Sequence, residues 1–247
     1  PSKKHKITIH HLLAQTSGIP NYFDVDDNEF YLLAKEHTPE ELINYYKNEP
    51  LLFEPGSKWA YSNSNYPLLG AALEKVTGLS LKEYLRIYIF EPLEMNATGL
   101  WYTKNTKRKQ IVTGYNSKKG ILFTAPKMVG SALYAPGGIV STTKDLFLWN
   151  EALKNKTNIS KYVVDQLITE KTTDDRKGTG YGYGFFLRNL QGSKTIQHGG
   201  NLFGFTTNGM YLPKEDMYVC ILANTKFDRT NEISNNIASR GRIRKNF

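Results

Sequence analysis

Two short groups of residues, far apart in the chain, carry side chains that could take part in catalysis. Tyr61-Ser62-Asn63 brings a phenol close to a carboxamide, and His198-Gly199-Gly200 follows a strand-like run. A phenol has an ordinary pKa of about 10, and adjacent cations would favour its phenolate, which can exchange a proton. An imidazole titrates near neutrality, and neighbouring glycines would let a substrate lie close to the backbone. Acyl transfer would need a nucleophile in addition to these groups.

The residues around both groups resemble a known family. The segments Ile7–Pro20 and Phe53–Tyr66, the latter followed by Leu69-Gly70, are similar to serine hydrolases of the penicillin-recognising kind. These are class C β-lactamases, D,D-peptidases, D-aminopeptidases and related esterases, and the resemblance covers most of the chain. It implies an α+β fold, in which an antiparallel sheet is flanked by helices and joined to a helical lobe. It also implies serine-dependent acyl transfer on D-amino-acid peptides, amides or esters.

The resemblance assigns roles to individual residues. Tyr61 and Asn63 match the family's Tyr-x-Asn motif, and His198 matches the first position of its Lys-Thr-Gly triplet, so these three are the catalytic candidates. Tyr61 would exchange a proton with the nucleophile or the leaving group, and the Asn63 amide would bind the family's lysine and polar groups of the substrate. The substrate-binding candidates are Gly199, Gly200 and Asn201. The Asn201 backbone N–H would be one donor to the oxyanion.

Two departures from the family's triplet change the expected substrate. Histidine replaces lysine at position 198, so the charge there would titrate near neutrality. Gly199 replaces threonine and removes a hydroxyl that would hold a substrate carboxylate. Esterase or peptidase activity therefore fits better than hydrolysis of β-lactam antibiotics.

The family's nucleophile belongs to a Ser-x-x-Lys motif upstream of Tyr-x-Asn, and these 247 residues begin too late to contain it. We therefore expect the chain to be inactive alone. Ser141-Thr142-Thr143-Lys144 matches the pattern by letter and opens a helix. Ser141 could thus be the nucleophile, but its place downstream of Tyr61 favours a helix cap. The alternative function is that of a truncated, non-catalytic relative that binds peptidoglycan-like ligands or a protein partner.

Composition and charge narrow the class of partner. The formal charge of +9 gathers near both ends and around residues 104–109, which indicates contact with an anionic envelope polymer or membrane surface, or merely solvated termini and a loop. No nucleic-acid motif accompanies the charge.

No cofactor is expected, and no metal site either, because His, Cys and carboxylates lack ligand spacing. Cys220 stands alone in an apolar, strand-like run. The expected location is the bacterial cell envelope or periplasm after export.

Hydrophobic spacing and turn residues predict the elements that hold these groups. Helices are expected over residues 8–16, 38–47, 65–76 and 81–90, then from the Ser141 segment to about 153, over 163–168 and over 231–238. Strands are expected at 183–187, 194–197, 205–212 and 217–222 as an antiparallel meander, with His198 ending an edge strand that faces a cleft shared with Tyr61. Residues 102–135 should be irregular. We expect one domain over 1–247, mainly helical from about 8 to 170, with strands and a final helix from about 181 to 240.

Overall fold

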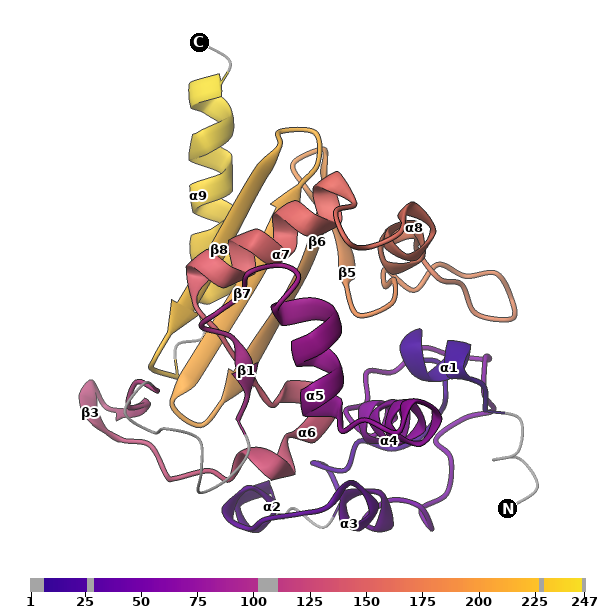
Figure 1. Ribbon diagram of the computed structural model, residues 1–247. Helices are drawn as coiled ribbons and strands as arrows, with labels where there is room; N and C mark the ends of the chain where they lie inside the picture. The colour runs from indigo at the N-terminus through magenta and orange to yellow at the C-terminus, as the bar shows by residue number, and fades with distance from the viewer. Residues whose placement is uncertain (1–6, 26–28, 102–110, 227–228, 246–247) are drawn as a thin grey trace.

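The computed structural model describes residues 7–25, 29–101, 111–226 and 229–245 (Figure 1). The first part is mainly helical, with α1 (Ile9–Leu13), α2 (Glu29–Ala34), α3 (Pro39–Asn44), α4 (Asn65–Thr77) and α5 (Leu81–Leu85), which continues into the π-helical turn η2 (Arg86–Phe90). The short elements β1 (Gly99–Leu100), β2 (Tyr115–Lys118), β3 (Ile121–Thr124), η4 (Gly130–Ala132), α6 (Tyr134–Gly137) and β4 (Ile139–Val140) follow. Two longer helices, α7 (Thr143–Asn155) and α8 (Lys161–Ile168), lead to the main sheet.

The main sheet is a four-stranded antiparallel meander, as the sequence predicts. Its strands are β5 (Phe186–Leu190), β6 (Ser193–Leu202), β7 (Phe205–Leu212) and β8 (Met217–Ala223), in the spatial order β5-β6-β7-β8. The final helix α9 (Thr230–Lys245) packs on β7 and β8. The mixed helical and antiparallel architecture confirms the expected α+β class.

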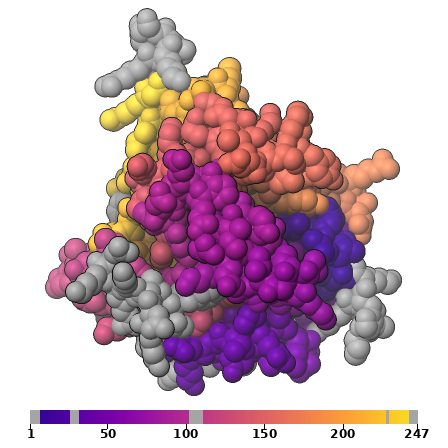
Figure 2. Space-filling view, viewed as in Figure 1, coloured from indigo at the N-terminus to yellow at the C-terminus, as the bar shows by residue number. Residues whose placement is uncertain are grey.

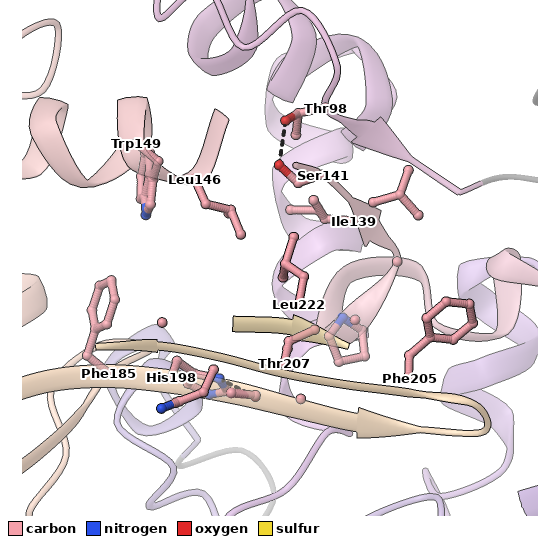
Figure 3. Close-up of a pocket in the computed structure, with 18 of the residues that line it drawn as sticks. Thr98, Ile139, Ser141, Leu146, Trp149, Phe185, His198, Phe205, Thr207 and Leu222 are labelled. Carbon is pink, nitrogen blue, oxygen red and sulfur yellow. Dashed lines mark hydrogen bonds between the residues drawn. The ribbon is translucent and has the colours of Figure 1, made fainter. Parts of the chain in front are cut away.

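The two faces of this sheet have different surroundings. Side chains of a strand alternate between faces, and β7 alternates between half-buried and buried positions along its length. Met210 and Leu212 form a core with Val219 and with Ala238 of α9. The opposite face, with Thr207 and Tyr211, borders a large cavity between the sheet and α7, which Figure 3 shows from close by. This second face positions the candidate site.

The helical part has its own core and sharply defined helix starts. Leu12, Leu42 and Leu81 pack together with three buried tyrosines, Tyr22, Tyr46 and Tyr134. Thr8, Thr38 and Ser80 close capping boxes at the starts of α1, α3 and α5, which satisfies backbone donors that a helix start leaves free. The surface of α4 and α5 lies between those of the α7–α8 segment and the α2–α3 segment in Figure 2. None of the helices within the described ranges has the length and apolar character that a membrane span needs.

Several element predictions need correction. Residues 115–124 form the β2–β3 hairpin within a segment that the sequence predicts to be irregular, because Lys119 and Gly120 take the positive φ angles of a tight turn. The predicted helix 81–90 changes to π-helical hydrogen bonding at Arg86. Strand β5 begins at Phe186, three residues later than expected, because the preceding residues turn at Gly184 with a φ of 83°. Residues 102–110, which contain the whole of the predicted basic segment 104–109, lie outside the described residues.

Candidate active site

The loop that contains Tyr61 and Asn63 is hydrogen-bonded to the segment that follows α1. Gln15 accepts a hydrogen bond at Oε1 from the backbone N–H of Ser62, and its carbonyl accepts from the N–H of Ala60. The Ser64 hydroxyl donates to the carbonyl of Pro20 and accepts from the N–H of Tyr22, at 2.7 and 2.8 Å. These hydrogen bonds tie the Tyr61 loop to the segment after α1 at several points. The two segments that resemble the family are therefore parts of one structural unit.

His198 reaches the same region from the sheet. It lies within β6 and pairs in register with Gly209 of β7, so both face the cavity below α7. Strand β6 continues to Leu202 and lies between β5 and β7, so the prediction that His198 ends an edge strand is wrong. The pairing with β5 stops at Gln197, however. From His198 onward, β6 has no strand partner on that side among the described residues, and the strand borders the cleft there.

The structure brings the predicted catalytic side chains together. The ring centroids of Tyr61 and His198 are 6.0 Å apart, and Phe186 lies beside both, at 6.1 Å from Tyr61 and 5.4 Å from His198. Tyr61, Asn63 and His198 all line one cavity of about 1870 Å³, together with Gly199, Gly200 and Asn201. The expectation of a single shared cleft agrees with this geometry. The catalytic roles of these residues remain a prediction.

Burial sets the protonation of the two rings. It raises the pKa of Tyr61 to about 12, with a smaller contribution from Tyr66, and it lowers the pKa of His198 below its ordinary value, partly offset by the bond to Gly199. The phenol is therefore protonated and the imidazole neutral at neutral pH. Since the Gly199 carbonyl can only accept, the 2.8 Å contact with His198 Nδ1 places the ring proton on Nδ1. His198 Nε2 therefore carries no hydrogen and can accept a proton or a hydrogen bond.

Gly199 and Gly200 differ in the space that a side chain would find at each position. A Cβ atom on Gly199 would lie 2.6 Å from the backbone oxygen of Thr207, whereas one on Gly200 would meet only the Thr207 Oγ1 atom, at 3.2 Å. Leu190 and Ser193 pair across the two-residue turn between β5 and β6, which directs the backbone groups of Ser193 toward β5, and Gly199 lies six residues further along the same strand. Residues two apart along a strand direct their backbone groups alike. The N–H of Asn201 therefore points toward the same open side, as an oxyanion donor would require.

Ser141 is neither beside these groups nor a helix cap. Its hydroxyl lies 2.7 Å from the hydroxyl of Thr98, on the cavity wall opposite His198 and Thr207 (Figure 3). The N-cap of α7 is Thr142, whose Oγ1 accepts from the N–H of Asp145. The predicted cap is thus one residue too early, because α7 begins at Thr143 and the extended residue directly before it is Thr142.

Some residues of the site carry no signal of their own in the sequence. Phe186 stacks on Tyr61, and Asn21 accepts two hydrogen bonds from Asn63. Phe185 and Trp149 face the cavity from opposite walls (Figure 3). Asn21 directly follows the segment Ile7–Pro20, so its proximity to a recognised motif was the one available indication.

A comparison with protein families matches the Beta-lactamase family model to residues 1–240. The chain belongs to the beta-lactamase family. Among curated members, Penicillin-binding protein 4* of Bacillus subtilis is 28% identical over 219 residues, which covers 81% of this chain and 48% of that protein. Protein flp of Staphylococcus aureus is 29% identical over 221 residues, covering 88% of this chain and 43% of that protein. The chain thus spans about half the length of the curated relatives it matches.

Several solved structures are similar to this chain in fold. A penicillin-binding protein from Bacillus halodurans superimposes with a TM-score of 0.78 at 24% identity, over 95% of this chain and 72% of that one. A D-amino acid amidase from Ochrobactrum anthropi SV3 reaches a TM-score of 0.82 at 20% identity, over 97% of this chain and 73% of that one. The octameric penicillin-binding protein homologue from Pyrococcus abyssi is 30% identical with a TM-score of 0.74, over 88% of this chain and 52% of that one. These likenesses support the arrangement of helices around the antiparallel sheet.

Proposed function

We propose that this chain supplies the substrate-binding side of a serine hydrolase that transfers acyl groups of D-amino-acid peptides, amides or esters. The observation that carries the proposal is the convergence of the Tyr61 and His198 rings, 6.0 Å apart, on the wall of a cavity that Asn63 also lines. Convergent polar groups in one concave site are typical of a catalytic centre. The family membership and the amidase likeness support the same class of substrate.

The protonation states suggest which of the two rings accepts a proton and which donates one. A neutral imidazole with a bare Nε2 atom is a better base at neutral pH than a phenol whose pKa is about 12. His198 would accept the proton of the attacking hydroxyl, and the Tyr61 hydroxyl would donate a proton to the leaving group. Transfer of the proton from His198 to the Tyr61 phenolate would then restore both neutral rings. The Asn201 N–H would stabilise the developing oxyanion. The serine that attacks is expected outside these 247 residues, and the cavity beside the rings has room for it.

The surroundings proposed for the protein follow the same family. Two relatives are named for binding penicillin, which supports a ligand of that chemical class for this chain. The formal charge of +9 favours contact with an anionic polymer of the envelope. We therefore place the protein in the bacterial cell envelope, after export.

The test compares the 247-residue chain with the protein translated from the same reading frame extended upstream. A fluorophosphonate probe should label a serine in the extended protein and none in the shorter chain. Tyr61→Phe in the extended protein should lower kcat/KM on a D-alanyl anilide by about 100-fold or more, the usual contribution of a positioned proton donor. Labelling of Ser141 would contradict the assignment of the nucleophile. An extended protein that binds D-alanyl peptides but hydrolyses none would favour the non-catalytic alternative.

A further inference from the structure

The β2–β3 hairpin presents apolar side chains to solvent. Every residue of β3 is exposed, and the exposed fractions of Ile121, Leu122 and Phe123 are 72%, 62% and 45%. The hairpin lies at the margin of the molecule (Figures 1 and 2). Single exposed apolar residues are ordinary on a protein surface, whereas a contiguous group of them indicates an interaction site. We call Ile121 and Leu122, the two most exposed of the three, the apolar tip.

The base of the hairpin is hydrogen-bonded to the main sheet. The Tyr115 N–H donates to the carbonyl of Asn224 at 2.9 Å, and the Tyr115 carbonyl accepts from the N–H of Lys226 at 3.0 Å. The side chain of Asn116 accepts at Oδ1 from the N–H of Gly204, also at 3.0 Å. These bonds attach the hairpin to the end of β8 and to the turn between β6 and β7. The apolar tip therefore projects from the fold in a defined direction.

Positive charge accompanies the apolar tip. Lys118 and Lys119, here called the turn lysines, are exposed, and neither takes part in an ion pair with another residue of the described ranges. From residue 95 to residue 144 the sequence contains eight Lys or Arg residues and no Asp or Glu. A segment of this composition attracts anions, and it contains no carboxylate that would compete with them.

A phospholipid membrane is the anionic partner that uses both features of the hairpin. An anionic polymer would pair with the turn lysines but would leave the apolar tip in water. Strand β3 has β2 as its partner in the described part of the chain, so a second copy could add along its other edge, but this would bring two sets of lysines together. At a membrane surface, apolar side chains leave water while lysine ammonium groups stay among the anionic head groups.

We propose that the β2–β3 hairpin is a contact site for anionic lipid membranes, in which the apolar tip inserts below the head groups and the turn lysines bind the lipid phosphates. This rests on the envelope location given under the proposed function and adds a partner to it. Ile111 and Val112, which precede the hairpin, line the cavity that contains Tyr61 and His198. The contact would therefore hold the candidate active site close to the lipid surface.

Co-sedimentation with lipid vesicles tests the contact in the 247-residue chain and in the protein extended upstream. Both should bind vesicles of phosphatidylglycerol and phosphatidylcholine at least about tenfold more tightly than vesicles of phosphatidylcholine alone. Ile121→Ser/Leu122→Ser should weaken binding to the anionic vesicles by about tenfold or more, because the inserted apolar area is lost. Lys118→Gln/Lys119→Gln should also weaken it by about tenfold or more, since each lysine near an anionic surface contributes roughly fivefold.

Matched variants elsewhere on the surface control for general changes in hydrophobicity and charge. Leu52→Ser/Val76→Ser removes two apolar residues with exposed fractions of 64% and 86%. Lys75→Gln/Lys82→Gln removes two exposed lysines and the same amount of charge. Both variants should bind within about twofold of the wild type, because charges beyond the Debye length are screened.

The depth of insertion gives an independent measurement. Leu122→Trp should gain fluorescence that brominated phospholipids quench, beyond the quenching of the three native tryptophans, whereas Val76→Trp should not. Unchanged vesicle binding by Ile121→Ser/Leu122→Ser would overturn the proposal. Binding that depends on the turn lysines alone and that soluble polyphosphate abolishes would instead assign the surface to an anionic polymer.

Two further outcomes would also overturn the proposal. A dimer in analytical ultracentrifugation that Ile121→Ser/Leu122→Ser dissociates would assign the hairpin to a second copy of the chain. Vesicle binding by the 247-residue chain that is lost in the extended protein would show that further polypeptide covers the apolar tip. None of these results bears on the labelling of a serine in the extended protein, so failure of the membrane contact and failure of the proposed hydrolase activity are distinguished.

Discussion

His198 shows how the fold changes the chemistry of a single residue. From its type alone, this imidazole would titrate near neutrality and act as a switchable positive charge. In the structure, burial lowers its pKa, and the Gly199 carbonyl holds the proton on Nδ1. Adjacent cations would lower the pKa of Tyr61 and favour its phenolate. In the structure, burial instead raises this pKa to about 12. The resulting pair is a neutral acceptor beside a neutral donor.

The lowered pKa of His198 predicts a loss of stability in acid. The folded chain binds fewer protons at this group than the unfolded chain does, so its contribution is fully present above about pH 6.5, the ordinary value, and is lost as the pH falls. His198→Gln should reduce the decrease in the free energy of unfolding between about pH 7 and about pH 5, measured by urea unfolding. His10→Gln is the comparison, because burial lowers the pKa of His10 also, and it lies outside the cavity. Identical pH dependences for the wild type and His198→Gln would contradict the burial of this ring.

At the scale of the elements, the start of α7 joins the cavity wall to the loop before β1. Thr142 caps the helix, and the buried Asp145 accepts hydrogen bonds of 2.8 Å from the Ala97 N–H and from the Thr98 hydroxyl. Ser141 bonds the same threonine. The Ser141-Thr142-Thr143-Lys144 segment matches a nucleophile motif by letter. In this junction, however, the hydroxyls of Ser141 and Thr142 make structural hydrogen bonds.

The cap of α7 predicts a specific pattern of stability. Thr142→Ala should cost about 1 kcal/mol of unfolding free energy, because it removes the acceptor for the Asp145 N–H. Thr142→Ser keeps that acceptor and should stay within about 0.5 kcal/mol of the wild type. Thr143→Ala, which changes an exposed residue of the first turn, is a control of similar size. Chemical denaturation gives all three values, and a Thr143→Ala loss as large as that of Thr142→Ala would place the cap elsewhere.

The pairing of β6 with β7 predicts different costs for the two glycines beside His198. Gly199→Ala would bring a Cβ atom against the Thr207 backbone oxygen, so we expect a loss of about 1–3 kcal/mol as the strands shift apart. Gly200→Ala meets only a side-chain hydroxyl that can turn away, so we expect less than about 1 kcal/mol. Thermal unfolding of both variants tests this order. If Gly200→Ala costs as much as Gly199→Ala, then the register of β6 against β7 is not the one described.

At the scale of the whole molecule, the main feature is the cavity between α7 and the sheet. Leu146, Trp149 and Leu153 share one face of α7, and all three line the cavity of about 1870 Å³. Protein interiors usually contain few voids larger than a water molecule. An apolar helix face beside a space of this size is typical of a site that receives a ligand or further polypeptide.

The cavity predicts that apolar residues on its wall contribute little to the stability of this chain. Leu146→Ala should cost less than about 1 kcal/mol, because the lost methyl groups border open space rather than a packed core. Leu42→Ala, at a position with 0% exposure, should cost about 2–5 kcal/mol. Urea unfolding of the 247-residue chain compares the two variants directly. Equal losses would mean that the wall around Leu146 closes up in solution.

The sequence by itself determined the class of fold, the order of the elements and the candidate residues. Helix caps, glycine stops and alternating strands are local signals, so α4, β7 and β8 agree closely with their predicted ranges, and α3 begins as predicted but ends at Asn44, before the expected residue 47. The likeness to the family rests on short segments whose residues are close in sequence, which is why Tyr61, Asn63 and His198 could be chosen without a structure.

Only the tertiary structure decided how these residues act on one another. Burial depends on packing between segments far apart in the chain, so the pKa directions of Tyr61 and His198 could not be predicted from residue types. The open side of β6 depends on where β5 stops pairing, and the orientation of Asn63 depends on Asn21, which is 42 positions earlier in the chain. Local patterns specify elements, whereas solvation and hydrogen-bond direction arise only when those elements meet.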